Sequence, residues 1–141
     1  MNNVGRISFY CIFVGIMGID LLRSVFVVGM GSFVGGAARF LLSVAMKSVG
    51  GFPWATLAVN LLGCLAIGAV YGFYSRAANG GGDAALFLTY GVCGGFTTFS
   101  TFSKETLMML QCGNYLGAVC YVCVSVFAGI ALTACGYLLA R

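Results

Sequence analysis

Long apolar runs separated by short polar breaks dominate the chain. A membrane helix needs about 20 apolar residues, and four runs reach that length. We expect helical spans over residues 24–46, 52–75, 84–111 and 114–140. The breaks between them are short, so consecutive spans should run in opposite directions. The pattern therefore predicts an all-α membrane protein with four transmembrane helices per subunit.

Residues 1–23 do not fit this pattern. Their apolar run, residues 7–19, lies between Arg6 and Asp20 and is too short for an easy span. It could be an interfacial segment, a signal-like stretch or sequence upstream of the true start, although no A-x-A-like cleavage site follows it. We favour a dispensable extension or a misassigned start, with the transmembrane domain over residues 24–141.

Composition and charge narrow the class of protein. The chain is 61% hydrophobic and only 7% charged, too apolar for a soluble domain of 141 residues. Its seven cations are scattered singly, which argues against nucleic-acid binding. With four spans, four cations lie on one side of the membrane and three lie on or near the other. Because such a small bias barely favours either orientation, the chain could insert both ways, unless a small unresolved bias decides.

Small residues recur at helical spacing. Four G-x-x-x-G pairs begin at Gly31, Gly68, Gly91 and Gly113, and each places two glycines on one helix face. Such pairs let helix backbones approach closely. We therefore expect tight helix packing, within a subunit or between subunits.

The least lipid-like part of the expected spans is residues 94–103. The pair Gly94-Gly95 weakens a helix, and residues 97–103 carry five hydroxyls and two phenylalanines. Hydrocarbon satisfies neither hydroxyls nor broken backbone, so this segment should face protein or an aqueous path. Phe99 and Phe102 share a helix face, and their ring edges carry positive potential that would suit a small anion. Core packing is the ordinary alternative.

Three further polar side chains lie in the expected spans. Asn60 sits near the centre of the second span, where its amide either donates to an anion or bonds a neighbouring helix. Arg39 and Glu105 lie toward span ends and can reach an interface, and Arg39 could attract anions to a vestibule. Glu105 is a weak candidate for the midmembrane carboxylate that a proton-coupled exporter needs.

Seven cysteines lie mostly within apolar runs, and we expect them to pack as small hydrophobic residues. Cys120 and Cys123 form a C-x-x-C, but apolar residues surround the pair in mid-span. A membrane thiol oxidoreductase would need a second pair to relay electrons. The chain has no histidine and no nucleotide-binding G-x-x-x-x-G-K-[ST], which argues against metal hydrolysis and ATP coupling.

Several motifs together carry a family resemblance. They are residues 35–40 (GGAARF), 56–63 (TLAVNLLG), 91–105 (GVCGGFTTFSTFSKE) and Tyr121-x-x-x-Ser125. In this order they resemble the CrcB/Fluc fluoride channel family over about residues 22–140. The resemblance implies a passive fluoride channel of the cytoplasmic membrane that lowers cytoplasmic fluoride, and not an enzyme. A small proton-coupled multidrug or cation exporter is the alternative.

The resemblance also implies an assembly and roles for residues. It implies an antiparallel, dual-topology homodimer in which each subunit has a broken third helix. Backbone oxygens of Gly94 and Thr97 would hold a structural Na⁺ at the dimer interface. Asn60, Phe99 and Phe102 would contact fluoride in the pore. Supporting polar positions would be Ser100, Thr101, Tyr121 and Ser125.

Overall fold

The computed structural model describes residues 3–46, 51–76 and 80–141, with side chains from residue 18 onward. All of its regular elements are helical. In chain order they are α1 (Asn3–Ala45), α2 (Trp54–Tyr74), α3 (Gly82–Leu86), η1 (Phe87–Cys93), α4 (Gly94–Phe96), α5 (Phe99–Gln111) and α6 (Tyr115–Ala140). The element η1 is a π-helix, and it continues directly into α4.

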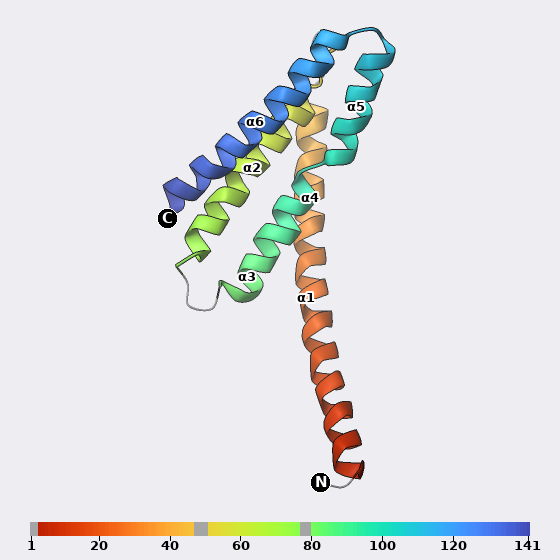
Figure 1. The fold of residues 1–141 in the computed structure, drawn as a ribbon, viewed down its shortest axis with the longest axis vertical. Helices are drawn as coiled ribbons and strands as arrows, with labels where there is room; N and C mark the ends of the chain where they lie inside the picture. Colours follow the sequence, from red (N-terminus) through yellow and green to blue (C-terminus); the bar gives the residue numbers. More distant parts are fainter. Residues whose placement is uncertain (1–2, 47–50, 77–79) are drawn as a thin grey trace.

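The long helical segments form two pairs. α1 lies beside η1 and α4, whereas α2 lies along α6 (Figure 1). The two helices of each pair run in the same direction, as the colours along the chain show (Figure 1). α5 is displaced sideways from α4 and packs beside the first half of α6. This displacement opens space between α2, α4 and α5.

Glycines set the spacing within both pairs. A Cβ added at Gly31 of α1 would lie 2.8 Å from the Cα of Gly91. In the other pair, a Cβ at Gly72 of α2 would lie 2.5 Å from the carbonyl oxygen of Tyr137. The expected close packing is confirmed for the G-x-x-x-G pairs in α1, α2 and η1–α4. It is wrong for Gly113, which follows α5 with φ of +76° and has nothing within 4 Å of its added Cβ.

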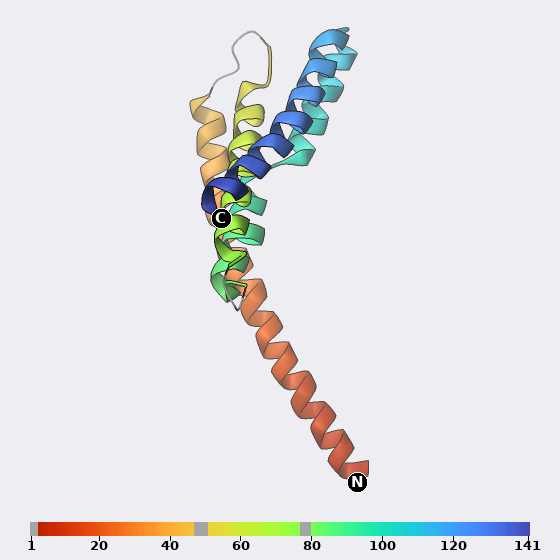
Figure 2. The ribbon, with the colours of Figure 1, turned by 60° about the vertical axis from the view of Figure 1, so that its left-hand side comes forward.

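The first helix is longer than the sequence indicates. A single helix joins residues 3–23 to the expected span, and its 43 residues correspond to about 65 Å. The N-terminal half of α1 extends away from the other helices (Figures 1 and 2). Where α1 meets them, Arg23 forms an ion pair with Asp83 in the first turn of α3. The expected boundary at residue 24 is therefore not a helix boundary.

Three helices are long and apolar enough to cross a membrane, within the ranges that the structure describes. They are Gly18–Ala45, Trp54–Tyr74 and Tyr115–Ala140. The remaining expected span, residues 84–111, is divided into α3, η1, α4 and α5. A fourth span is thus not found as one long helix, and the four-span count stays a prediction.

Candidate functional site

The chain leaves helical geometry between α4 and α5. Thr97 and Thr98 both have extended backbones, with φ of −80° and −148° and ψ of 155° and 116°. Gly94 and Gly95, which we expected to weaken the helix, are both helical. An interruption of this kind leaves carbonyl groups at the end of α4 and N–H groups at the start of α5 without intrahelical partners.

Asn60 of α2 bonds both backbone groups of Thr98. The Thr98 N–H donates to Asn60 Oδ1 over 2.8 Å, and Asn60 Nδ2 donates to the Thr98 carbonyl oxygen over 3.1 Å. The side-chain amide thus replaces the backbone partners that a helix would have supplied. Asn60 therefore bonds the backbone at the helix break, and one amide hydrogen is left over for another acceptor.

Two backbone carbonyls at the break lack the N–H donors that they would have in a continuous helix. The helical partner of the Gly94 carbonyl would be the Thr98 N–H, which donates to Asn60. The helical partner of the Thr97 carbonyl would be the Thr101 N–H, which donates to Thr98 Oγ1 over 3.3 Å. Two backbone oxygens at the break are therefore available to another partner.

Hydroxyl groups gather at the start of α5. Thr98 caps the helix through its bond to Thr101, and its Oγ1 also donates to Thr101 Oγ1 over 3.1 Å. The Ser100 and Thr98 hydroxyls lie 3.3 Å apart. Sequence reasoning did not select Thr98, although threonine immediately before a helix is a common N-cap. Thr98 connects Asn60, Ser100 and Thr101 into one hydrogen-bonded group.

A cavity of about 360 Å³ lies at the break. Six of the candidate residues line it: Asn60, Gly94, Thr97, Phe99, Phe102 and Ser125. The other lining residues are Gly63, Cys64, Ile67, Cys93, Thr98 and Val126. None of the twelve is ionisable as a carboxylate or an amine. The structure thus brings together most of the predicted pore residues in a cavity of amide, hydroxyl, backbone and aromatic groups.

Aromatic rings extend from this cavity into the protein. The Phe99 and Phe102 ring centroids lie 5.6 Å apart, and Phe102 lies 5.0 Å from the ring of Tyr121. Tyr121 is fully buried, whereas Phe99 is 79% exposed in the single chain. Phe102 therefore has a structural contact that Phe99 lacks.

Glu105 belongs to a separate hydrogen-bonded group. Its carboxylate accepts from Thr56 Oγ1 over 2.8 Å and from the Tyr121 hydroxyl over 2.9 Å. Tyr121 therefore points its hydroxyl at Glu105, and it does not line the cavity that Ser125 lines. Ser125 Oγ is buried without a hydrogen-bond partner in the described part of the chain. Tyr121 and Ser125, both expected as supporting polar positions, thus face different surroundings.

Arg39 lies at the end of α4, outside the cavity. Its Nε donates to the carbonyl oxygen of Gly95 over 3.2 Å. A cation is favourable there because the C-terminal end of a helix carries partial negative charge. Arg39 therefore stabilises the interrupted end of α4 from α1.

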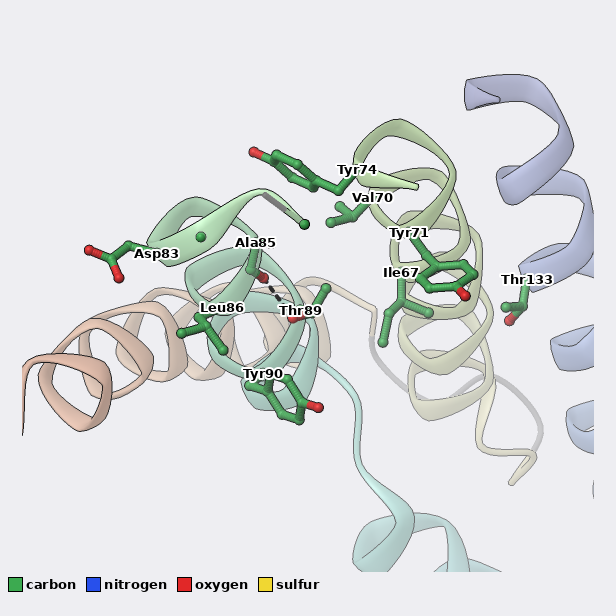
Figure 3. Close-up of a pocket in the computed structure, with 12 residues that line it drawn as sticks. Ile67, Val70, Tyr71, Tyr74, Asp83, Ala85, Leu86, Thr89, Tyr90 and Thr133 are labelled. Carbon is green, nitrogen blue, oxygen red and sulfur yellow. Dashed lines mark hydrogen bonds between the residues drawn. The ribbon is translucent and has the colours of Figure 1, made fainter. Parts of the chain in front are cut away.

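A larger cavity, of about 730 Å³, lies elsewhere, between the end of α2 and the start of α3 and η1. Tyr71, Tyr74 and Tyr90 surround it, with Asp83 at its edge (Figure 3). The Thr89 hydroxyl is occupied by a 2.6 Å bond to the Ala85 carbonyl. None of the predicted site residues lines this cavity.

Comparison with known proteins places the chain among relatives. The family described as CrcB-like protein, Camphor Resistance (CrcB), matches residues 26–137. The chain belongs to the CrcB family. The match includes Asn60, the interrupted segment and all but the last three residues of α6, and it begins after the N-terminal part of α1.

Individual CrcB relatives match over most of their length. A protein of Phocaeicola vulgatus named Fluoride-specific ion channel FluC is 43% identical over 77% of this chain and 91% of its own length. A protein of the same name from Elusimicrobium minutum is 42% identical over 83% of this chain and 93% of its own. A third, from Chlorobaculum tepidum, is 43% identical over 86% and 97%.

Proposed function

We propose that this chain is a passive fluoride channel of the cytoplasmic membrane. Its membership of the CrcB family and its similarity to proteins named Fluoride-specific ion channel FluC support this function. Its long apolar helices make it a multi-pass membrane protein. Fluoride accumulates inside a cell when neutral HF enters from an acidic exterior and dissociates. A channel lets the anion leave down its electrochemical gradient and so lowers cytoplasmic fluoride.

The bond pattern of Asn60 is the observation that carries the proposal. One amide hydrogen holds the Thr98 carbonyl, and the other is available in a cavity lined by Phe99, Phe102 and Ser125. A small anion there meets N–H, O–H and ring-edge donors and no carboxylate. These groups replace part of the hydration shell that fluoride loses on entering the membrane.

The working unit is a homodimer of opposed copies. In the single chain Phe99 is 79% exposed, so a side chain proposed to contact fluoride has no wall facing it. A second copy would supply that wall. The near-even distribution of cations allows each chain to insert in either orientation. Labelling of an introduced cysteine from each side of the membrane tests this, because a single accessible side would exclude the antiparallel pair.

A structural Na⁺ fits the oxygens at the break. The carbonyls of Gly94 and Thr97 have lost their helical donors to Asn60 and Thr98, and carbonyl oxygens suit a hard cation. Gly94 is exposed in the single chain, so its carbonyl is accessible to an opposed copy. Two copies would offer four such oxygens. A bound cation would supply positive charge beside the anion path.

The two alternatives receive no support from the structure or the relatives. The only carboxylate near the break, among the described residues, is Glu105, which accepts two hydroxyl hydrogen bonds outside the cavity. Cys120 and Cys123 are free and exposed, and neither lines the cavity. Neither arrangement favours proton-coupled export or thiol redox chemistry.

Ion efflux from liposomes containing only this protein tests the function. Fluoride efflux should be electrogenic and should far exceed chloride efflux, because the cavity's donors can surround the smaller anion more closely. Equal fluxes of the two anions, or no fluoride flux from correctly folded protein, would contradict the proposal.

A further inference from the structure

Two cysteines line the same cavity as Asn60 and the helix break. Cys64 comes from α2, one helical turn after Asn60, and Cys93 comes from η1, immediately before Gly94. Both thiols are free. Cys64 is partly buried and Cys93 is 6% exposed. The proposed passage of fluoride uses neither sulfur.

The Cys64 side chain lies between α2 and α6, next to a glycine and a polar residue. The Sγ lies against Gly129 of α6, where an added Cβ would approach it to 3.3 Å. Ser125, one turn before Gly129, lines two cavities together with Cys64. Its hydroxyl is the buried oxygen without a partner in the described residues. The wall between α2 and α6 therefore presents a thiol beside an unsatisfied hydroxyl.

We propose that Cys64 and Cys93 make this cavity a site for soft, thiophilic metal cations such as Hg²⁺. Thiolate sulfur is a soft ligand and prefers soft metal ions, whereas the oxygens of Gly94 and Thr97 prefer hard ones. No group of three or more His, Cys, Asp or Glu side chains gathers within the described residues, and the proposed site offers the two thiols alone. Each thiol loses its proton to solvent as its sulfur–metal bond forms, and no electron is transferred.

Occupation of this site blocks fluoride. The cavity is about 360 Å³ and also holds the amide of Asn60, so a metal on Cys64 stands beside the group that binds the anion. This consequence rests on the proposed channel function. The metal site itself rests only on the two thiols, so metal binding and channel function can be tested separately.

The other described cysteines supply controls. Cys112, Cys120, Cys123 and Cys135 are exposed, and none of them lines this cavity. Cys120→Ala is matched to Cys64→Ala, since both remove one thiol from a long apolar helix. A variant with alanine at every cysteine except Cys64 and Cys93 isolates the pair. The reciprocal variant, Cys64→Ala with Cys93→Ala, leaves the remaining cysteines in place.

The test measures Hg²⁺ adducts by intact mass in detergent and Hg²⁺ inhibition of fluoride efflux in liposomes. Inhibition is expressed relative to each variant's own uninhibited flux. The variant retaining only the pair should form a mercury adduct and be inhibited, with reversal by excess dithiothreitol. Replacing a residue that only hydrogen-bonds a metal ligand lowers metal affinity about 10–100-fold. Removing a ligand itself, as in Cys64→Ala, should therefore raise the half-inhibiting Hg²⁺ concentration at least about tenfold. Cys120→Ala should not.

Three results would overturn the inference. The first is that the variant retaining only Cys64 and Cys93 forms no mercury adduct, and the second is that it forms an adduct but its fluoride flux is unaffected. The third is that the reciprocal variant, which lacks both thiols, stays fully sensitive to Hg²⁺. Absence of fluoride flux before any metal is added would instead contradict the proposed function. In that case the adduct masses would still report whether the thiol site exists, and size-exclusion profiles would identify any variant that had misfolded.

Discussion

Asn60 holds the extended backbone of Thr98 through two hydrogen bonds, because its Oδ1 accepts from the Thr98 N–H and its Nδ2 donates to the Thr98 carbonyl oxygen. The residues are 38 positions apart, and Thr98 lies between α4 and α5 whereas Asn60 lies in α2. This pair keeps α4 and α5 separate, and it leaves the Gly94 carbonyl without its helical donor. The interruption of the helix is thus a tertiary feature that depends on a side chain of α2.

Replacing Asn60 with aspartate should abolish most fluoride flux. Aspartate keeps the oxygen that accepts from Thr98, but it loses the donor to the Thr98 carbonyl and places negative charge in an anion-binding cavity. Leaving that carbonyl unsatisfied costs about 1–3 kcal/mol. Liposome efflux measures the loss. The matched control is Asn114→Asp, because Asn114 caps α6 by accepting from Gly117 and aspartate caps equally well. Equal effects of the two changes would show that Asn60 has no special role.

Phe99→Ile and Phe102→Ile should both cut fluoride flux but should differ in stability. Isoleucine keeps apolar bulk and removes the positive ring edge. Phe102 also packs on Tyr121 at 5.0 Å, so its replacement should lower stability by about 0.5–1.5 kcal/mol more than that of Phe99. Thermal unfolding in detergent alongside efflux separates the two effects. Normal flux in both folded variants would show that the rings only pack.

Glu105 and Tyr121 should be energetically coupled. Tyr121→Phe removes the hydroxyl that donates to Glu105 and should destabilise the protein by about 1 kcal/mol. Glu105→Gln removes one of the two carboxylate oxygens that accept from Thr56 and Tyr121. In the double variant the cost should be smaller than the sum of the single costs. Additive changes in the unfolding midpoint would show that the hydrogen bond contributes nothing.

The sequence predicts the long helices better than the interruption. Apolar runs place α2 and α6 within two residues of their ends, because both helices are set by local composition. Their parallel alignment follows from close approaches such as that of Gly72 to Tyr137, which no local pattern specifies. The first helix is longer than predicted because nothing in the sequence terminates it near residue 24.

Half of the twelve residues that line the cavity were predicted from the sequence, whereas the hydrogen bonds that connect them were not. The five hydroxyls of residues 97–103 mark it, because hydrocarbon cannot satisfy them. The break lies after the glycine pair, since Gly94 keeps helical torsions of −64° and −40° while Thr97 and Thr98 do not. The π-helical turns of η1 and the bonds from Asn60 to Thr98 depend on contacts between distant segments. Motif spacing alone does not contain that information.

Gly94 and Gly95 provide a test of the dimer because the space around them differs in the single chain. A Cβ added at Gly95 would lie 2.8 Å from the Cα of Ser32 in α1, so Gly95→Ala should disturb the subunit itself. A Cβ added at Gly94 meets only the Thr89 carbonyl oxygen, at an ordinary 3.7 Å, and Gly94 is exposed. Crowding within the subunit therefore gives no reason for Gly94→Val to be severe.

Gly94→Val should nevertheless abolish fluoride flux if an opposed copy packs against this face around Na⁺. The subunit should keep its helical content while the dimer dissociates or loses its sodium dependence, and Gly94→Ala should show a weaker form of the same defect. Circular dichroism reports whether the subunit keeps its helices, and dimer mass in detergent reports whether the dimer persists. Efflux measured with and without Na⁺ reports the sodium dependence. A Gly94→Val protein that remains dimeric and conducts normally would mean that no partner and no ion meets the Gly94 carbonyl.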